Sequence, residues 1–260
     1  MARWAAAVEY DGSPYCGWQI QDGQPSVQAA VEAALSRVAD HRVAVQCAGR
    51  TDTGVHATGQ VIHFDSNADR EPRSWVFGGN ANLPPSIALL WAHPVSESFN
   101  ARFSAVARRY RYIITNREVR PAILHRRAVW DRRPLDADAM ARAADPLVGT
   151  HDFTSYRAVA CQAKSPVRTI HELTVERRGS LIHIDVEANA FLHHMVRTLA
   201  GTLMAVGAGE ADEDWPRRVL EARDRRVAGM TARPGGLYLT AVRYPEAFGL
   251  PALSGDPGLW

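Results

Sequence analysis

Hydrophobic and polar residues alternate along this chain with two different periods, which exchange repeatedly between residue 1 and residue 245. A period of two predicts a strand, because successive side chains of a strand point to opposite faces of a sheet. A period near 3.6 predicts a helix with one buried face. Strands are expected at 3–10, 43–47, 58–64, 87–91, 106–115, 167–177, 181–188 and 236–242, and helices at 27–39, 75–83, 136–148, 189–206 and 213–223.

The order of these elements is similar before and after about residue 102, which predicts an α+β fold of two halves. We place the first half at 1–101, the second at 102–245 and an irregular tail, rich in Pro and Gly, at 246–260. A chain of 260 residues is long enough for one large domain or two small ones.

The helix expected at 189–206 has two contrasting faces. Leu, Met and Val form an apolar stripe, whereas His193, His194, Arg197 and Gly201 fall on the opposite side. Adjacent side chains point about 100° apart on a helix, so His193 and His194 are unsuited to share a metal ion, and we predict no metal site. We expect the polar side to face a cleft or water.

Composition and charge restrict the possible functions only weakly. The hydrophobic fraction of 46% and the charged fraction of 22% are those of an ordinary globular protein, and a formal net charge of +2 does not indicate nucleic acid. Almost every cation is arginine, and six Arg-Arg pairs occur; guanidinium groups bind phosphates and stack on bases. Because genome composition also produces such a bias, the pairs are a weak indication of RNA binding.

The three cysteines are far apart and lack the spacing of metal ligands, which fits a reduced, cytosolic protein. The first apolar run is too short for a signal peptide, and no run approaches the length of a membrane span. We therefore expect a soluble cytoplasmic protein without a membrane partner.

The segment from Ala48 to Ala57 has the most concentrated chemistry. Arg50, Asp52 and His56 lie within seven residues between two glycines, and both flanks resemble strands. Asp52 is thus expected at a strand-to-strand connection, where a rigid sheet can present one carboxylate. An aspartate that caps its own turn gives the same pattern, and the spacing does not decide between the two interpretations.

Two other classes of protein fit part of this pattern. Asp52-Thr53-Gly54 is also the active triplet of aspartic proteases, but those enzymes need two such carboxylates, and this chain has a single triplet among mixed helices and strands. A non-catalytic RNA-binding module would explain the arginines and tyrosines, but it leaves the glycine-framed Asp52 without a role.

The strand expected at 106–115 alternates strictly, and Tyr110 and Tyr112 share one face with Arg108. Such a face can stack on bases, although cross-strand aromatic pairs in a half-buried sheet explain it equally well, and the pattern alone favours the latter. The pair His151-Asp152 hints at a metal phosphohydrolase, but no further ligands accompany it, and we favour a capped helix start.

Many short segments, in order, resemble the family of bacterial tRNA pseudouridine synthase A as far as about residue 250. Three positions depart from the commonest family pattern: Thr53 replaces an alanine, Cys16 an aromatic residue or histidine, and Asn100 a histidine. None removes a reactive group, but Thr53 bears on the hydrogen bonding of the carboxylate, and Asn100 leaves any role of a histidine there in doubt. The matching segments are 9–12, 17–19, 48–56, 59–61, 80–84, 101–104, 107–112, 152–155, 188–191, 193–197 and 236–239.

The resemblance implies an isomerase that converts uridine to pseudouridine at positions 38, 39 and 40 of the tRNA anticodon stem-loop, without metal, redox cofactor or energy source. It also implies two ferredoxin-like halves whose antiparallel sheets join into one central sheet, with helices on one side and the active cleft between the halves. The implied partners are the anticodon arm of tRNA and a second copy of the chain in a homodimer, with no DNA. An enzyme that modifies three neighbouring positions is expected to recognise the shape of the tRNA and not its base sequence. The arginine pairs would then form a positively charged surface that leads the tRNA to the cleft.

The resemblance also implies roles for five residues. Asp52 is the essential carboxylate, which either attacks covalently or removes a ribose proton to give a glycal. Arg197 orients Asp52 and keeps it charged. Tyr110 stacks on the target base and is a candidate for removing the C5 proton, Arg50 holds the flipped-out RNA, and His193 is a further substrate-binding residue.

Overall fold

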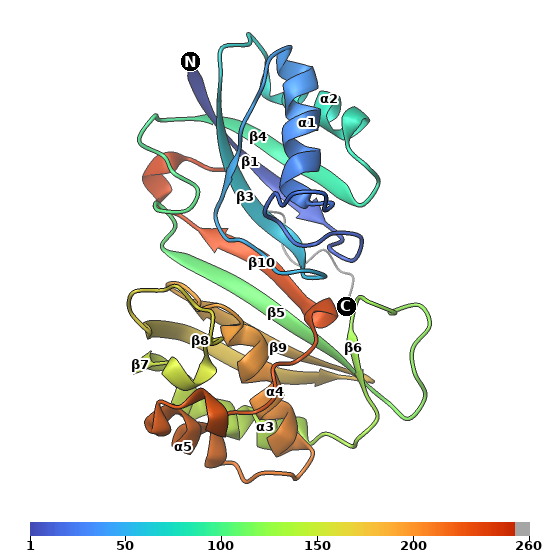
Figure 1. The fold of residues 1–260 in the computed structure, drawn as a ribbon, viewed down its shortest axis with the longest axis vertical. Helices are drawn as coiled ribbons and strands as arrows, with labels where there is room; N and C mark the ends of the chain where they lie inside the picture. Colours follow the sequence, from blue (N-terminus) through green and yellow to red (C-terminus); the bar gives the residue numbers. More distant parts are fainter. Residues whose placement is uncertain (253–260) are drawn as a thin grey trace. The chain divides into compact units, whose positions relative to one another are not determined.

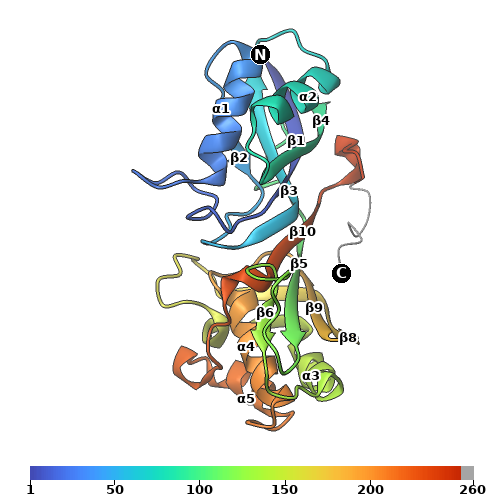
Figure 2. The same ribbon diagram turned by 90° about the vertical axis from the view of Figure 1, so that its right-hand side faces the viewer.

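A computed structural model describes residues 1–252 of the chain as two compact units. The first contains residues 1–106 together with those from 238 onward, and the second contains residues 107–237. Each unit packs helices against a sheet (Figures 1 and 2). The expected α+β class is therefore confirmed. No helix among residues 1–252 is long and apolar enough to span a membrane.

The first unit has the ferredoxin-like order of elements, with strands arranged β4-β1-β3-β2. These four strands pair antiparallel, whereas β10 lies parallel to one end of β3, through Tyr238 opposite His56. The helices α1 and α2 lie on one face of the sheet (Figure 2). The elements are β1 (Ala2–Tyr10), α1 (Val27–Ala39), β2 (Gln46–Cys47), β3 (His56–Ser66), α2 (Pro72–Asn82), β4 (Ile87–Val95) and β10 (Leu237–Arg243).

The second unit arranges its strands as β5-β9-β8-β7, all antiparallel, and β6 pairs parallel to the other edge of β5. Helix α3 packs against β8 and α4. The expected hairpin between β8 and β9 is confirmed. The elements are β5 (Ala107–Asn116), β6 (Val129–Asp131), α3 (Ala137–Ala144), β7 (Gly149–Asp152), β8 (Val167–Arg178), β9 (Leu181–Ala188), α4 (Met195–Gly207) and α5 (Trp215–Ala222).

Helix α1 forms as the sequence predicts. The Ser26 hydroxyl caps its N-terminus by accepting a hydrogen bond of 3.3 Å from the Ala29 amide. Apolar residues at helical spacing, including Val27, Val31 and Leu35, are buried against the sheet. In the second unit, Asp152 ends β7 and accepts from the Thr154 amide and hydroxyl, but the short 3-10 helix that follows, Thr154–Tyr156, has Phe153 at its N-cap position and no side-chain cap.

The strand expected at 43–47 forms only at Gln46–Cys47. The reason is tertiary: the Val43 amide donates to the Ser36 hydroxyl at 2.9 Å, and the Val45 amide donates to the Glu32 carboxylate at 3.0 Å. Both acceptors are side chains of α1, and they take the place of a neighbouring strand for these amides.

The structure also differs from the expected division of the chain. The closing strand β10, which we placed in the second half, lies in the first unit because it pairs with β3. Part of the tail expected to be irregular forms a short 3-10 helix, Glu246–Phe248, whose Phe248 ring lies 5.1 Å from the ring of buried Phe99. Residues 253–260 of that tail lie outside the described part of the chain. The joining of the two sheets, with a cleft between the halves, stays a prediction.

Candidate active site

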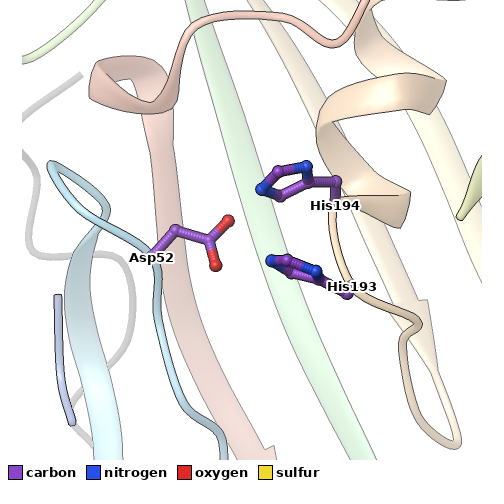
Figure 3. Close-up of side chains that lie close together, drawn as sticks. All are labelled: Asp52, His193 and His194. Atoms are coloured by element: carbon purple, nitrogen blue, oxygen red, sulfur yellow. The ribbon is translucent and has the colours of Figure 1, made fainter. Parts of the chain in front are cut away.

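Asp52 projects from a loop, residues 48–55, that connects β2 to β3 (Figure 3). The loop is fixed at its base by Gln60, whose side chain is fully buried on β3. The Gln60 amide nitrogen donates to the Gly49 carbonyl at 2.6 Å, and its oxygen accepts from the Gly49 amide at 3.3 Å. The hydroxyls of Tyr10 and Thr51 share a buried hydrogen bond of 2.8 Å. These contacts leave Asp52 half-buried on a rigid support.

A second segment, Gly17-Trp18, holds the loop from the side. The Trp18 amide donates to the Thr51 carbonyl at 3.0 Å, and the Trp18 ring is buried 5.9 Å from that of Tyr10. Gly17 has a φ of +94°, and a Cβ atom there would lie 2.7 Å from the Thr51 carbonyl oxygen. Only glycine permits this approach of the two backbones.

His56, at the far end of the loop, is part of the framework. Its Nδ1 accepts from the Gly12 amide at 3.1 Å and lies 3.2 Å from the Asp11 carboxylate. Both contacts hold the ring at the base of the β1-to-α1 connection. The buried ring also stacks on Tyr238 at 4.6 Å. The histidine of the motif thus anchors β10 to β3.

Arg50 is exposed at the start of the loop, beside Cys47. Burial raises the pKa of the Cys47 thiol to about 12, against an opposing effect of the Arg50 and Arg102 charges. Cys47 is therefore a neutral thiol and an apolar packing residue. The charge of Arg102, from the segment after β4, acts on the same thiol as that of Arg50.

The two tyrosines on one face of β5 differ in their surroundings. Tyr110 is 8% exposed, and its ring meets Phe191 edge-on at 5.0 Å. Tyr112 is fully buried, and its hydroxyl donates to the Arg233 carbonyl at 2.8 Å. Burial raises the pKa of Tyr112 far above its usual value, although the Arg197 charge opposes that effect. Tyr112 is accordingly an anchor, and the contact of Tyr110 with a substrate base stays a prediction.

His193 and His194 lie on the chain that enters α4, before the helix begins (Figure 3). The sequence places the helix start at 189, but His194 has a φ of +61°, which prevents helical geometry, and α4 starts at Met195. The two rings lie 4.0 Å apart with a tilt of 42°. The argument that a helix separates their side chains is therefore wrong, while the absence of a metal stays a prediction.

Arg197 lies in the first turn of α4 and is half-buried. Its Nε donates to the Ala232 carbonyl at 2.8 Å, and its own carbonyl accepts from the Ala232 amide at 3.0 Å. We expected this side of the helix to face a cleft or water, but residues 229–232 cover part of it. The sequence carries no signal for this contact, because the two segments are 35 residues apart.

In at least five of the six arginine pairs, at least one arginine forms a salt bridge with a carboxylate of the same chain. In the second unit, for example, Arg109 contacts Glu172 at 2.9 Å and Arg133 contacts Glu210 at 2.6 Å. These salt bridges partly neutralise the arginines, so they have less positive charge available to bind a phosphate than the sequence suggests. Other paired arginines in salt bridges are Arg178, Arg217, Arg218 and Arg226.

Comparison with known proteins assigns this chain to a family. A family model described as tRNA pseudouridine synthase matches residues 6–104 and 143–245, which include the Asp52 loop in one unit and α4 in the other. The chain belongs to the tRNA pseudouridine synthase family. It is also similar to three curated proteins named tRNA pseudouridine synthase A. The one from Nitrosococcus oceani is 58% identical over 99% of this chain and 100% of its own. Those from Pseudomonas aeruginosa and Alcanivorax borkumensis are 57% and 56% identical over 96% of this chain, and over 88% and 94% of their own.

The expected site residues are divided between the two units of the chain. Asp52 and Arg50 belong to the first unit, and Tyr110, His193 and Arg197 belong to the second. The sequence interpretation missed the residues that support them. Gln60 had a usable signal, since it is a polar side chain within an apolar strand, and Gly17 had one as a glycine directly before an aromatic residue, Trp18, in a loop.

Proposed function

We propose that this chain isomerises uridine to pseudouridine in tRNA, at positions 38, 39 and 40 of the anticodon stem-loop. The observation that carries the proposal is the full-length match to the family together with a rigid loop that presents one half-buried carboxylate, Asp52. The substrate base must leave its stack, which costs a few kcal/mol before any chemistry occurs.

The reaction breaks the bond between ribose C1′ and N1, turns the base and forms a bond from C1′ to C5. The C5 proton leaves and N1 gains a proton, so the reaction is balanced without any co-reactant. We assign the first step to Asp52, which acts either as a nucleophile or as the base that forms a glycal. Gln60 and Thr51 fix the loop that carries Asp52. This supports both routes, because each needs the carboxylate to be held in one position.

Arg197 and Tyr110 complete the proposed chemistry. We assign Arg197 to orient and charge-balance Asp52, a role supported by its fixed Nε contact with Ala232. Tyr110 is assigned to pack against the target base and is the candidate to accept the C5 proton. The packing of its ring edge-on against Phe191 at 5.0 Å supports this role, because it holds the ring in one orientation.

The remaining assignments concern the RNA. Exposed Arg50, next to Asp52, suits a contact with the phosphate or vacated stack of the flipped nucleotide, and exposed His193 suits a further substrate contact. We also propose that the chain acts as a homodimer on the anticodon arm and reads tRNA shape, since three neighbouring positions share no fixed sequence context.

The test is to incubate the protein with unmodified tRNA and to map pseudouridine by carbodiimide-dependent stops of reverse transcription. We expect stops confined to positions 38, 39 and 40. The Asp52→Asn variant, nearly isosteric, is the control: it should bind tRNA like the wild type and yield no product. Product from Asp52→Asn would refute the catalytic assignment. Binding by the wild type without product would favour a non-catalytic RNA-binding module.

A further inference from the structure

The chain between α5 and β10 passes along α4 (Figures 1 and 2). We call residues 229–233 of this connection the strap. At one end, the Gly229 amide donates to the Thr202 hydroxyl at 3.2 Å. At the other end, Ala232 makes the two hydrogen bonds to Arg197 described above. The strap therefore follows about one and a half turns of the helix, from Thr202 back to Arg197.

Gly201, one turn after Arg197, lies at the closest approach of the strap to the helix. A Cβ atom at position 201 would lie 1.8 Å from the Met230 carbonyl oxygen, a distance that no real structure permits. The obstacle is backbone, so a side-chain rotation cannot relieve it. Glycine inside a helix is about 1 kcal/mol less favourable than alanine. The helix thus carries a locally unfavourable residue at the one position where the strap requires it.

The strap is also fixed away from the helix. Before its contact with Arg197, the Thr231 hydroxyl accepts from the Arg225 guanidinium at 2.9 Å. After that contact, the Arg233 carbonyl accepts from the buried Tyr112 hydroxyl of β5 at 2.8 Å. The Ala232 carbonyl, which receives the Arg197 Nε, is therefore held from both sides and not only by the arginine itself.

From these contacts we infer that the strap positions the Arg197 guanidinium and that Gly201 is a positioning residue, because it allows the strap to close on α4. This inference rests on the proposed function, in which Arg197 acts on Asp52. The inference explains why position 201 is a glycine, and it gives the strap a role although the strap has no reactive group of its own.

The test is Gly201→Ala in the full-length protein. At an ordinary helical position this change stabilises, but here it must push the Met230 carbonyl away and loosen the Ala232 contact. We expect hydrogen exchange at the Ala232 amide to accelerate, kcat to fall about 100-fold, and the Kd for tRNA to stay within twofold. A general defect of the second unit would instead weaken kcat and tRNA binding together.

Two matched variants control for side effects. Gly207→Ala adds the same methyl group to the same helix, but its Cβ would press on the buried Met140 side chain at 2.7 Å and would lie 3.3 Å from the Asp136 carbonyl oxygen, so any strain falls away from the strap. Met230→Ala removes a side chain that is 87% exposed and leaves the carbonyl in place. Both variants should retain the wild-type kcat and the wild-type rate of hydrogen exchange at the Ala232 amide. If Gly201→Ala fails to fold, Thr231→Val, which loses the Arg225 contact without added bulk, should lower kcat about tenfold and leave the Kd unchanged.

The outcomes separate the two proposals. Wild-type kcat in Gly201→Ala, with accelerated exchange at Ala232, would overturn the positioning role while the proposed function stands. Unchanged exchange in that variant would overturn the steric argument itself. If the wild type forms no pseudouridine, the proposed function fails, and the catalytic role of the strap fails with it.

Discussion

Gln60→Leu tests the claim that the Asp52 loop is held from below. Leucine has a similar volume but cannot bond the Gly49 amide and carbonyl, which Gln60 contacts at 3.3 and 2.6 Å. Each backbone group left unpaired costs about 1–3 kcal/mol when it is buried. Because Gly49 is only half-buried and water can reach it, we take the lower part of that range and expect a loss of about 2–3 kcal/mol in the free energy of unfolding.

The assay is urea unfolding of the full chain, followed by tryptophan fluorescence, since Trp18 packs on Tyr10 next to this loop. Turnover measured well below the transition should also fall, as the carboxylate loses its fixed position. Gln46→Leu is the matched control, because Gln46 is exposed on β2, and its substitution should change stability by less than about 0.5 kcal/mol. A Gln60→Leu protein as stable as this control would refute the reasoning.

Three further predictions concern the second unit. Arg197→Ala should retain tRNA binding but lose most of kcat in a single-turnover assay, and wild-type turnover would remove Arg197 from the chemistry. Tyr110→Phe keeps the ring against Phe191 and should retain tRNA affinity while kcat falls; an unchanged kcat would limit Tyr110 to packing. His183 is 1% exposed, and burial, with the nearby Arg111 and Arg178 charges, lowers its pKa below 6.5. The unfolded chain therefore binds the proton more readily, so the stability associated with neutral His183 is present above about pH 6.5 and is lost as the pH falls towards the folded pKa. His183→Leu should flatten that loss in urea titrations at pH 7 and pH 5.5, and an unchanged pH dependence would contradict the assignment.

Sequence reasoning succeeded where structure is local. The cap at Ser26 and the apolar face of α1 depend on residues within one helix, and both are found as expected. The predicted bounds of strands and helices were wrong where contacts with residues distant in the sequence determine the local structure. The amides of Val43 and Val45 bond to α1 side chains and not to a strand. His194 adopts a left-handed conformation that shortens α4, and no propensity for histidine announces it.

In the candidate site, too, the sequence indicates local features but not the contacts between distant segments. The motif makes Asp52 a candidate, because a glycine-framed carboxylate between strands is visible in sequence, but its spacing fits a turn-capping aspartate equally well. The roles of Asp52 and Arg50 follow from the family resemblance and stay predictions. Gln60, which fixes the loop, lies on the strand that follows it, only 11 residues from Gly49, whereas Trp18 and Ala232 come from segments far away in the chain. Such contacts depend on tertiary packing, which hydrophobic periodicity does not specify.

The place of β10 in the first unit bears on how the protein is made. Residues 107–237 form one uninterrupted stretch, whereas the first unit takes its strands from 1–106 and then, much later in the chain, from β10. Domains generally fold in the order of their synthesis, N-terminal first. Here the sheet that carries Asp52 receives β10 only after all of the second unit has left the ribosome. A nascent chain stalled before residue 237 would expose the edge of β3 that β10 covers, which is where a chaperone would be expected to bind.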